Sequence, residues 1–266
     1  RGDVSRGPSH AEVRRRVAPQ GRDGFYTGEC AEDMVSSLNA LGGCHAAEDF
    51  AELKTFATQP VSGRYPLFDL YEHPPNGQGA TAILLMNILE QMELERYAAD
   101  SAERLHIEAE ATKLAFDARN RFIADPETST TERMLSLDVA QQLTGLIDPK
   151  RALTQPTALT ESVHKDTVYI TVVDKDRMAV SLIYSIFKDF GSGIASDKFG
   201  VLLQNRGGGF TLEEGHPNEL KGGKRPMHTI IPAMLKKNGK VIMPFGVMGG
   251  AYQCCGHARV VTNMID

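Results

Sequence analysis

The sequence of 266 residues has no tryptophan, few cysteines and no excess of basic residues. Its formal net charge of −5 provides no basic surface for nucleic acid, so we expect no nucleic-acid partner. No apolar run reaches the roughly 18 residues of a membrane-spanning helix, and no internal repeat is visible. A chain that is 41% hydrophobic can bury the core of one large or two small globular domains.

The four cysteines show no metal-binding spacing. Cys30 and Cys44 stand apart, and Cys254 and Cys255 are adjacent, which is poor geometry for a disulfide. We therefore expect reduced structural thiols, no metal site and no organic cofactor.

Helical patterns fill the first half of the chain, and strand patterns fill the second. Helices are predicted over 10–17, 28–41, 46–58, 79–92, 101–123 and 136–146. Strands are predicted over 67–71, 168–174, 178–185, 201–203, 229–235 and 241–247. Segments 168–174 and 178–185 are expected to form a hairpin, and Lys237-Asn238-Gly239 is expected to join the last two strands. This order indicates an α+β layered domain.

The longest helical pattern, 101–123, begins at a candidate N-cap, Ser101, and ends before Asp125-Pro126. Its inward stripe is predicted to comprise Leu105, Glu108 or Ala109, Thr112, Ala115 and Phe116.

Asp166-Thr167 follows a polar segment, 148–165, that reads as an exposed linker. A threonine that opens a strand after an exposed linker can become an N-terminal nucleophile once the bond before it is cut. Its hydroxyl attacks a carbonyl, and its own α-amine, with an ordinary pKa of about 7.7–8.0, acts as the base. The β-branch restricts χ1 and helps to hold the oxygen in place. Position alone does not distinguish this role from that of a common strand residue.

Several motifs in collinear order resemble the γ-glutamyltranspeptidase family, the glutathione hydrolases with an N-terminal nucleophile, and more narrowly its shorter, acylase-like branch. In the second half the matching segments are 166–169, 172–176, 190–194, 200–207, 215–218, 223–226 and 245–250. In the first half they are 25–29, 74–79 and 110–116. The resemblance covers nearly the whole chain, and the ordered set is far more specific than any one motif.

The resemblance implies a four-layer αββα sandwich, which we expect to be incomplete at both ends of this chain. It also implies that one precursor cleaves itself between Asp166 and Thr167. Residues 1–166 then form the end of a large subunit that is mostly helical and closes in a linker. Residues 167–266 form the start of a small subunit made mostly of strands. Together the two segments are expected to make one domain.

The resemblance also implies site residues for a small-molecule substrate, a γ-glutamyl or related acyl amide. Thr167 would be the nucleophile, Ser185 would orient it, and backbone N–H groups of Gly249 and Gly250 would stabilise the oxyanion. By residue type alone, Ser185 is equally an ordinary strand serine and Gly249-Gly250 a plain turn. The loop 74–79 resembles a motif that packs near the cleft.

Substrate recognition is where this chain departs from the transpeptidases. Gly209 stands where they place an acid for the glutamyl amino group, and Phe187 replaces an asparagine near the nucleophile. His228 and Thr229 replace a serine pair after Arg-Pro. Arg206 and His228 are therefore candidates to bind a substrate carboxylate, as in a glutaryl amide, because arginine suits bidentate carboxylate binding.

Two other functions fit the residues. In the first, the chain would be a non-catalytic paralogue or truncated product that keeps the fold and acts as a binding module. In the second, it would be an enzyme that uses Cys254 or Cys255 as nucleophile. The first predicts an intact chain without amide hydrolysis, and the second predicts sensitivity to thiol alkylation.

Overall fold

A computed structural model describes residue 4 and residues 6–154 and 167–265. The chain divides into two compact units, one from Arg1–Ala57 with Phe190–Asn205, the other from Thr58–Asp189 with Arg206–Asp266. Each unit combines segments that are distant in sequence. Among the described residues, every predicted catalytic and substrate-binding residue belongs to the second unit.

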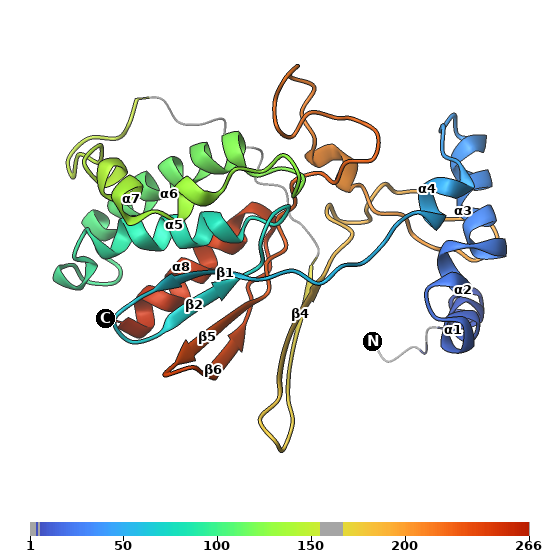
Figure 1. Cartoon of the computed structure of the whole chain (residues 1–266), viewed down its shortest axis with the longest axis horizontal. Coiled ribbons are helices and arrows are strands. Elements are labelled where there is room, and N and C mark those ends of the chain that lie inside the picture. Colours follow the sequence, from blue (N-terminus) through green and yellow to red (C-terminus); the bar gives the residue numbers. More distant parts are fainter. Residues whose placement is uncertain (1–3, 5, 155–166, 266) are drawn as a thin grey trace. The chain divides into compact units, whose positions relative to one another are not determined.

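The first unit is helical. It contains α1 (Pro8–Gln20), α2 (Asp23–Tyr26), α3 (Gly28–Ala40) and α4 (Ala47–Ala51) (Figure 1). Val13, Cys30 and Phe199 form its small core. The Asp33 carboxylate accepts hydrogen bonds from the backbone N–H groups of Lys198 at 2.9 Å and Phe199 at 3.0 Å. These bonds link the segment Phe190–Asn205 to α3.

The second unit contains a four-stranded antiparallel sheet in the order β1-β2-β5-β6. Its strands are β1 (Val61–Arg64), β2 (Asp69–Glu72), β5 (Ala233–Lys237) and β6 (Lys240–Phe245). Asp69 pairs with Lys236, and Leu70 pairs with Leu235. The sheet therefore joins strands from both halves of the chain.

Helices pack against this sheet and around one buried helix, α5 (Figure 1). The central helix is α5 (Gly79–Glu90), and the helices around it are α6 (Ala102–Phe122), α7 (Leu137–Thr144) and α8 (Gln253–Ile265). The 3₁₀ turns of this unit are η1 (Leu94–Arg96), η2 (Glu132–Leu135), η3 (Arg206–Gly209) and η4 (Gly250–Tyr252). Gly79 to Leu89 are all buried, so α5 is buried on every side, and most of these residues are apolar. Each large apolar side chain buried there contributes about 1.5–3 kcal/mol to stability.

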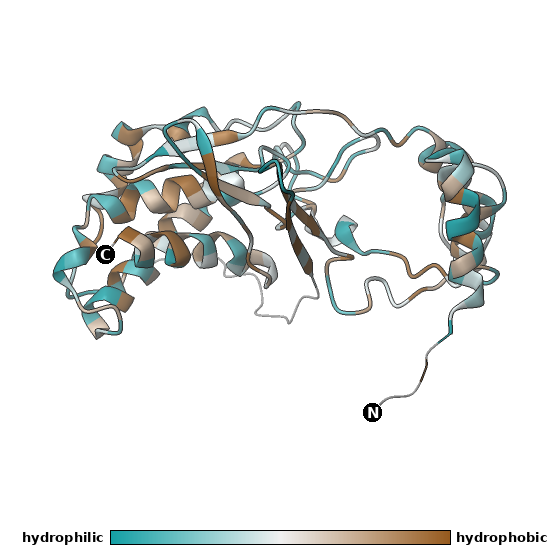
Figure 2. Ribbon diagram, turned by 90° about the horizontal axis from the view of Figure 1, so that it is seen from below, coloured by the Kyte–Doolittle hydropathy of each residue, from teal (hydrophilic) through white to brown (hydrophobic). Residues whose placement is uncertain are grey.

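A separate antiparallel hairpin consists of β3 (Val168–Val173) and β4 (Ala179–Tyr184). The Asp174 carboxylate closes its turn by accepting the N–H groups of Asp176 at 2.9 Å and Met178 at 2.8 Å. Figure 2 shows the hairpin as strongly hydrophobic. Seven of its apolar or aromatic residues are between 39% and 54% exposed, namely Val168, Ile170, Val172, Val173, Val180, Leu182 and Tyr184.

Most predicted helices are confirmed, but the helix predicted over 46–58 is wrong in length. It ends at Ala51, where the Arg22 side chain binds carbonyl groups at and just beyond the helix end. The guanidinium donates to Phe50 O at 3.1 Å, to Ala51 O at 2.5 Å and to Leu53 O at 2.9 Å. A side chain thus satisfies carbonyls that further helical turns would have used.

Two strand predictions need correction, and one strand was missed. The strand predicted from Thr229 begins only at Ala233, because Pro232 has no N–H for the ladder. Segment 201–203 forms only an isolated bridge between Ala195 and Leu202. The strand Val61–Arg64 was not predicted at all.

The inward stripe predicted for α6 is partly wrong. Ala115 and Phe116 are buried as predicted, whereas Leu105 is 51% exposed. The buried face runs instead through Ile107 and Ala111. Ser101 is confirmed as N-cap, because its hydroxyl accepts the N–H of Arg104 at 3.2 Å. Among the described helices, none is both long and apolar enough to cross a bilayer.

Candidate active site

Thr167 lies directly before β3 and is 9% exposed. In the hairpin, Val168 pairs with Tyr184. Extending this register by one residue places Ser185 opposite Thr167. The Ser185 hydroxyl accepts the backbone N–H of Phe187 at 2.9 Å, which fixes its direction. Asp166, on the other side of the expected cleavage, lies outside the described residues.

Gly249 and Gly250 form a turn between β6 and α8 that glycine alone adopts without strain. Their φ angles are +126° and +59°. The turn leads through η4 into α8, so its backbone N–H groups lie at the positive end of a helix. This geometry suits stabilisation of a developing oxyanion.

Tyr169 connects the start of β3 to the segment that carries this turn. Its hydroxyl lies 2.8 Å from Ser181 Oγ, and Ser181 donates to Phe245 O at 3.3 Å. A Cβ added to Gly246 would lie 2.4 Å from the Tyr169 ring. Thr167 and Tyr169 are two residues apart and project from one strand face. That face of β3 is therefore beside the segment leading to the glycine turn.

Replacing Gly246 by alanine is expected to destabilise the protein by about 1–3 kcal/mol, because the methyl group collides with the Tyr169 ring. Gly145→Ala is the matched control, since Gly145 has φ −63° and its new Cβ has no neighbour nearer than 3.4 Å. Urea-unfolding midpoints at unchanged m-value measure the difference. Equal midpoints for the two variants would show that the Tyr169 contact does not constrain Gly246.

The buried Gln78 side chain forms hydrogen bonds with the glycine turn and with the neighbouring backbone. Its side-chain N–H₂ donates to Thr229 O at 2.9 Å and to Gly250 O at 3.1 Å. Its oxygen accepts from the Arg119 guanidinium at 3.1 Å. Arg119 is 2% exposed and lies 4.1 Å from the Phe116 ring centroid, and burial lowers its pKa. Sequence reasoning singled out the 74–79 loop but neither Gln78 nor Arg119.

The 74–79 loop packs on the segment that contains the predicted substrate residues. Asn76 donates through its side chain to Pro226 O at 2.6 Å, and Asn76 O accepts the N–H of His228 at 3.0 Å. Thr229 is 5% exposed. This loop thus aligns the backbone of His228 and Thr229 beside Gln78.

Arg206 and His228 lie close enough for the charge of one to affect the other. The Arg206 guanidinium is 5.3 Å from the Phe187 ring centroid, and burial lowers the Arg206 pKa to about 10. Burial, followed by the charges of Arg206, His73 and Arg225, lowers the pKa of His228 to about 3. At neutral pH the site therefore combines a charged arginine with an uncharged histidine.

Acid is expected to destabilise the protein through His228. Its pKa is about 3 in the folded state and about 6.5 in the unfolded chain, so between these values the unfolded state binds more protons. Stability therefore falls as the pH drops from 6.5 towards 3, by up to about 1.4 kcal/mol per pH unit from this group. His228→Gln should flatten this part of a plot of unfolding free energy against pH. An unchanged slope would mean that His228 takes up its proton normally in the folded protein.

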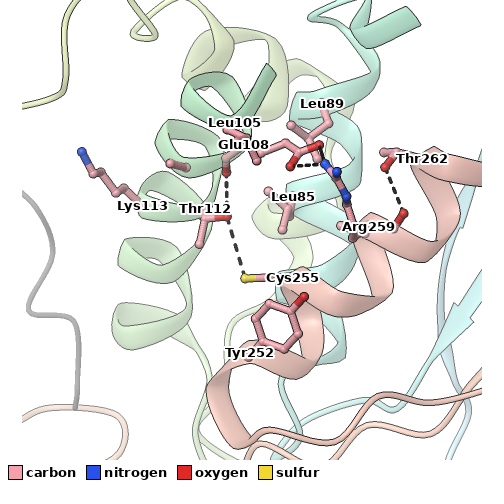
Figure 3. Close-up of a pocket in the computed structure, with 12 residues that line it drawn as sticks. Leu85, Leu89, Leu105, Glu108, Thr112, Lys113, Tyr252, Cys255, Arg259 and Thr262 are labelled. Carbon is pink, nitrogen blue, oxygen red and sulfur yellow. Dashed lines mark hydrogen bonds and ion pairs between the residues drawn. The ribbon is translucent and has the colours of Figure 1, made fainter. Parts of the chain in front are cut away.

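A groove of about 530 Å³ lies between α6 and α8, and Thr167 is not among the residues that line it (Figure 3). Its lining includes Leu105, Ala109 and Thr112, so this part of the predicted inner stripe of α6 faces the groove and not the core. Glu108 and Arg259 pair at 2.5 Å along it. Figure 3 shows Cys255 beneath Thr112, and the Cys255 sulfur lies 3.8 Å from the Thr112 hydroxyl.

The two adjacent cysteines do not form a catalytic arrangement. Burial raises the pKa of Cys254, which is fully buried. A hydrogen bond from Cys254 lowers the pKa of Cys255, against the effect of burial. The described residues that line the groove include no histidine to act as base. Across the described part of the chain, no three His, Cys, Asp or Glu side chains are grouped as metal ligands would be.

Comparison with known proteins gives consistent matches over the whole chain. Residues 1–266 match the family model described as gamma-glutamyltranspeptidase. The glutathione hydrolase-like YwrD proenzyme of Bacillus subtilis (strain 168) is 37% identical over 252 residues, covering 94% of this chain and 47% of the relative. The oxamate amidohydrolase proenzyme of Klebsiella pneumoniae is 32% identical over 266 residues, covering 99% of this chain and 49% of the relative.

The fold is also that of a solved acylase. The crystal structure of cephalosporin acylase from Bacillus halodurans superimposes with a TM-score of 0.89 at 37% identity, covering 100% of this chain and 48% of that one. The predicted N-terminal-nucleophile hydrolase fold of the α+β class is thereby confirmed. The chain spans about half the length of the curated relatives that it matches. By the match along its full length and by these relatives, the chain belongs to the gamma-glutamyltranspeptidase family.

Proposed function

We propose that this protein is a self-processing amidohydrolase that hydrolyses an acyl amide, or transfers its acyl group to an amine, through an acyl-enzyme on Thr167. One precursor is cleaved between Asp166 and Thr167, and residues 1–166 and 167–266 stay together as the two subunit segments of one domain. Family membership supports the reaction class. Its main structural support is that Thr167 opens β3 on the face where Tyr169 lies against Gly246.

Self-cleavage and catalysis use the same atoms. In processing, the Thr167 hydroxyl attacks the Asp166 carbonyl carbon, and the peptide C–N bond breaks as the ester forms, which frees the α-amine. Water then hydrolyses the ester and releases the Asp166 carboxylate and the Thr167 hydroxyl. In catalysis, that amine takes the hydroxyl proton as the oxygen attacks the substrate carbonyl. The Gly249 and Gly250 N–H groups stabilise the oxyanion, and Ser185 orients the nucleophile. The leaving amine departs with the proton, and water or an acceptor amine then breaks the ester.

The proposed substrate is a γ-glutamyl or related amide whose acyl group carries a carboxylate. Arg206 remains protonated at neutral pH, because even a pKa of about 10 lies well above it. His228 is uncharged there, so it offers the carboxylate a hydrogen bond without a second positive charge. Thr229 lies next to His228 on the segment aligned by Gln78. Gly209 offers no acid for a glutamyl amino group, which favours a glutaryl-type acyl group over a γ-glutamyl one.

The intact mass of the purified protein, followed by N-terminal sequencing of any smaller product, tests the processing step. A product that begins with Thr167 is expected. Hydrolysis of γ-glutamyl and glutaryl p-nitroanilides then tests the reaction, and the glutaryl compound should have the higher kcat/KM. An uncleaved protein without hydrolysis would favour the alternative function, a non-catalytic member of the family that acts as a binding module.

A further inference from the structure

Glu72 and His257 form a fully buried pair that the proposed reaction does not use. His257 Nδ1 lies 2.7 Å from Glu72 Oε1, and both side chains are 0% exposed. Glu72 ends β2, and His257 lies in α8, the helix that follows the glycine turn. Burial raises the pKa of the Glu72 carboxyl, and His257 partly opposes the shift. A buried ionisable pair is costly to build, so a purely apolar contact would stabilise this position at least as well.

The second nitrogen of the His257 ring contacts the segment between β6 and the turn. Val247 donates its backbone N–H to His257 Nε2 at 3.2 Å. A ring nitrogen that accepts this bond carries no proton, so Nδ1 must carry the ring proton and donate it to Glu72. Glu72 thereby selects the tautomer, and the tautomer provides the acceptor for Val247.

The side chain of Val247 is also restrained, by its contact with α8. A Cβ added to Gly256 would lie 2.6 Å from Val247 Cγ1, so the Val247 side chain lies directly over the α8 backbone. Val247 precedes Gly249 by two residues. At the other end of the turn, Gln78 binds Gly250 O. Buried side chains therefore hold the turn on both sides.

We propose that Glu72 and His257 are positioning residues for the Gly249–Gly250 turn. By fixing the Val247 N–H, the pair sets the path of the backbone into the turn and so the direction of its N–H groups. The effect on rate rests on the proposed function, whereas the effect on backbone order does not. Oxyanion donors act only at about 2.7–3.1 Å from the developing charge, and a misplacement of about 1 Å can cost about a hundredfold in rate.

Two substitutions of His257 separate positioning from simple loss of packing. The side-chain amide of His257→Gln reaches the place of Nε2. This variant therefore keeps an acceptor for the Val247 N–H but loses the hydrogen bond to Glu72. The shorter side-chain amide of His257→Asn reaches only the place of Nδ1. This variant therefore keeps the hydrogen bond to Glu72 but loses the acceptor for the Val247 N–H. Both remove an imidazole ring from the same buried position. Glu72→Gln keeps an acceptor for Nδ1–H and serves as the conservative variant.

Hydrogen–deuterium exchange of a peptide spanning 246–252 provides the readout without activity. His257→Asn should exchange at least about tenfold faster there than His257→Gln, while the β3–β4 hairpin exchanges equally in both. With a glutaryl p-nitroanilide, kcat should be at least about tenfold lower for Asn than for Gln, with KM within about twofold. Glu72→Gln should resemble the wild type in both measurements.

Equal exchange of this peptide in the Asn and Gln variants would overturn the proposal. A wild-type protein that neither cleaves itself nor hydrolyses amides would refute the proposed function, and the exchange contrast would still decide the positioning role. Should a variant fail to fold, ¹⁵N shifts of the histidine ring in the wild type decide instead. A neutral ring protonated at Nδ1 supports the proposal, and one protonated at Nε2 overturns it.

Discussion

The Thr167→Ala protein is expected to remain a single polypeptide and to lose at least about a thousandfold in amide hydrolysis relative to the cleaved wild type. The proposed mechanism uses the Thr167 hydroxyl twice, first to break the chain and then to form the acyl-enzyme. Its removal therefore abolishes both steps, and without cleavage the α-amine that serves as base is never released. Denaturing electrophoresis, intact mass and steady-state rates measure the two effects.

Thr171→Ala is the matched control, because Thr171 is an exposed threonine of the same strand whose hydroxyl contacts only Tyr169 among the bonds described for it. It should cleave itself and hydrolyse amides normally. Thr167→Ser keeps the oxygen and the amine but loses the χ1 restriction, so it should cleave more slowly and retain part of the activity. Persistent cleavage of Thr167→Ala before residue 167 would reject Thr167 as the self-processing group.

Gly249→Ala is expected to lower kcat by about 10²–10³-fold, which corresponds to about 3–4 kcal/mol, with little change in KM. Gly249 has a φ of +126°, a conformation that an alanine adopts only under strain. The added Cβ would also lie 3.4 Å from the Tyr252 ring. Relief of this strain rotates the peptide units of the turn and moves their N–H groups away from the oxyanion.

Gly215→Ala introduces comparable backbone strain elsewhere in the same unit, because Gly215 has a φ of +78° and open space around its new Cβ. Both variants should lose stability, but only Gly249→Ala should lose kcat. Steady-state kinetics on the glutaryl p-nitroanilide, together with thermal unfolding, distinguishes the two losses. A Gly249→Ala protein with normal kcat would show that this turn does not bind the oxyanion.

The β3–β4 hairpin could be predicted because its signals are local. Alternating apolar residues on either side of Lys175-Asp176 predict two paired strands, and the structure confirms this hairpin, with Val168 paired with Tyr184. The long helices were predictable for the same reason, since their periodicity lies within each segment. The start of β5 was predicted four residues too early, at Thr229, and Pro232, which has no backbone donor, directly precedes the observed strand.

The polar residues around the glycine turn could not be predicted. Gln78 contacts a carbonyl 172 residues away, and Glu72 contacts a ring 185 residues away. From sequence alone, a glutamine or glutamate is predicted to be exposed, because burying a polar side chain costs free energy unless a hydrogen-bond partner is present. The partner here comes from the other half of the chain, and no periodic pattern marks it.

The amino-acid sequence by itself determined most of the helices, though not α8, together with the hairpin, the resemblance to the gamma-glutamyltranspeptidase family and Thr167 as candidate nucleophile. Only the tertiary structure decided that β1 and β2 pair with β5 and β6, that α5 is buried on every side, and that Gln78 and His257 tie down the turn at Gly249. The division follows from the range of the forces. Local periodicity and turn chemistry act within a few residues, whereas buried polar contacts form only once packing brings distant segments together.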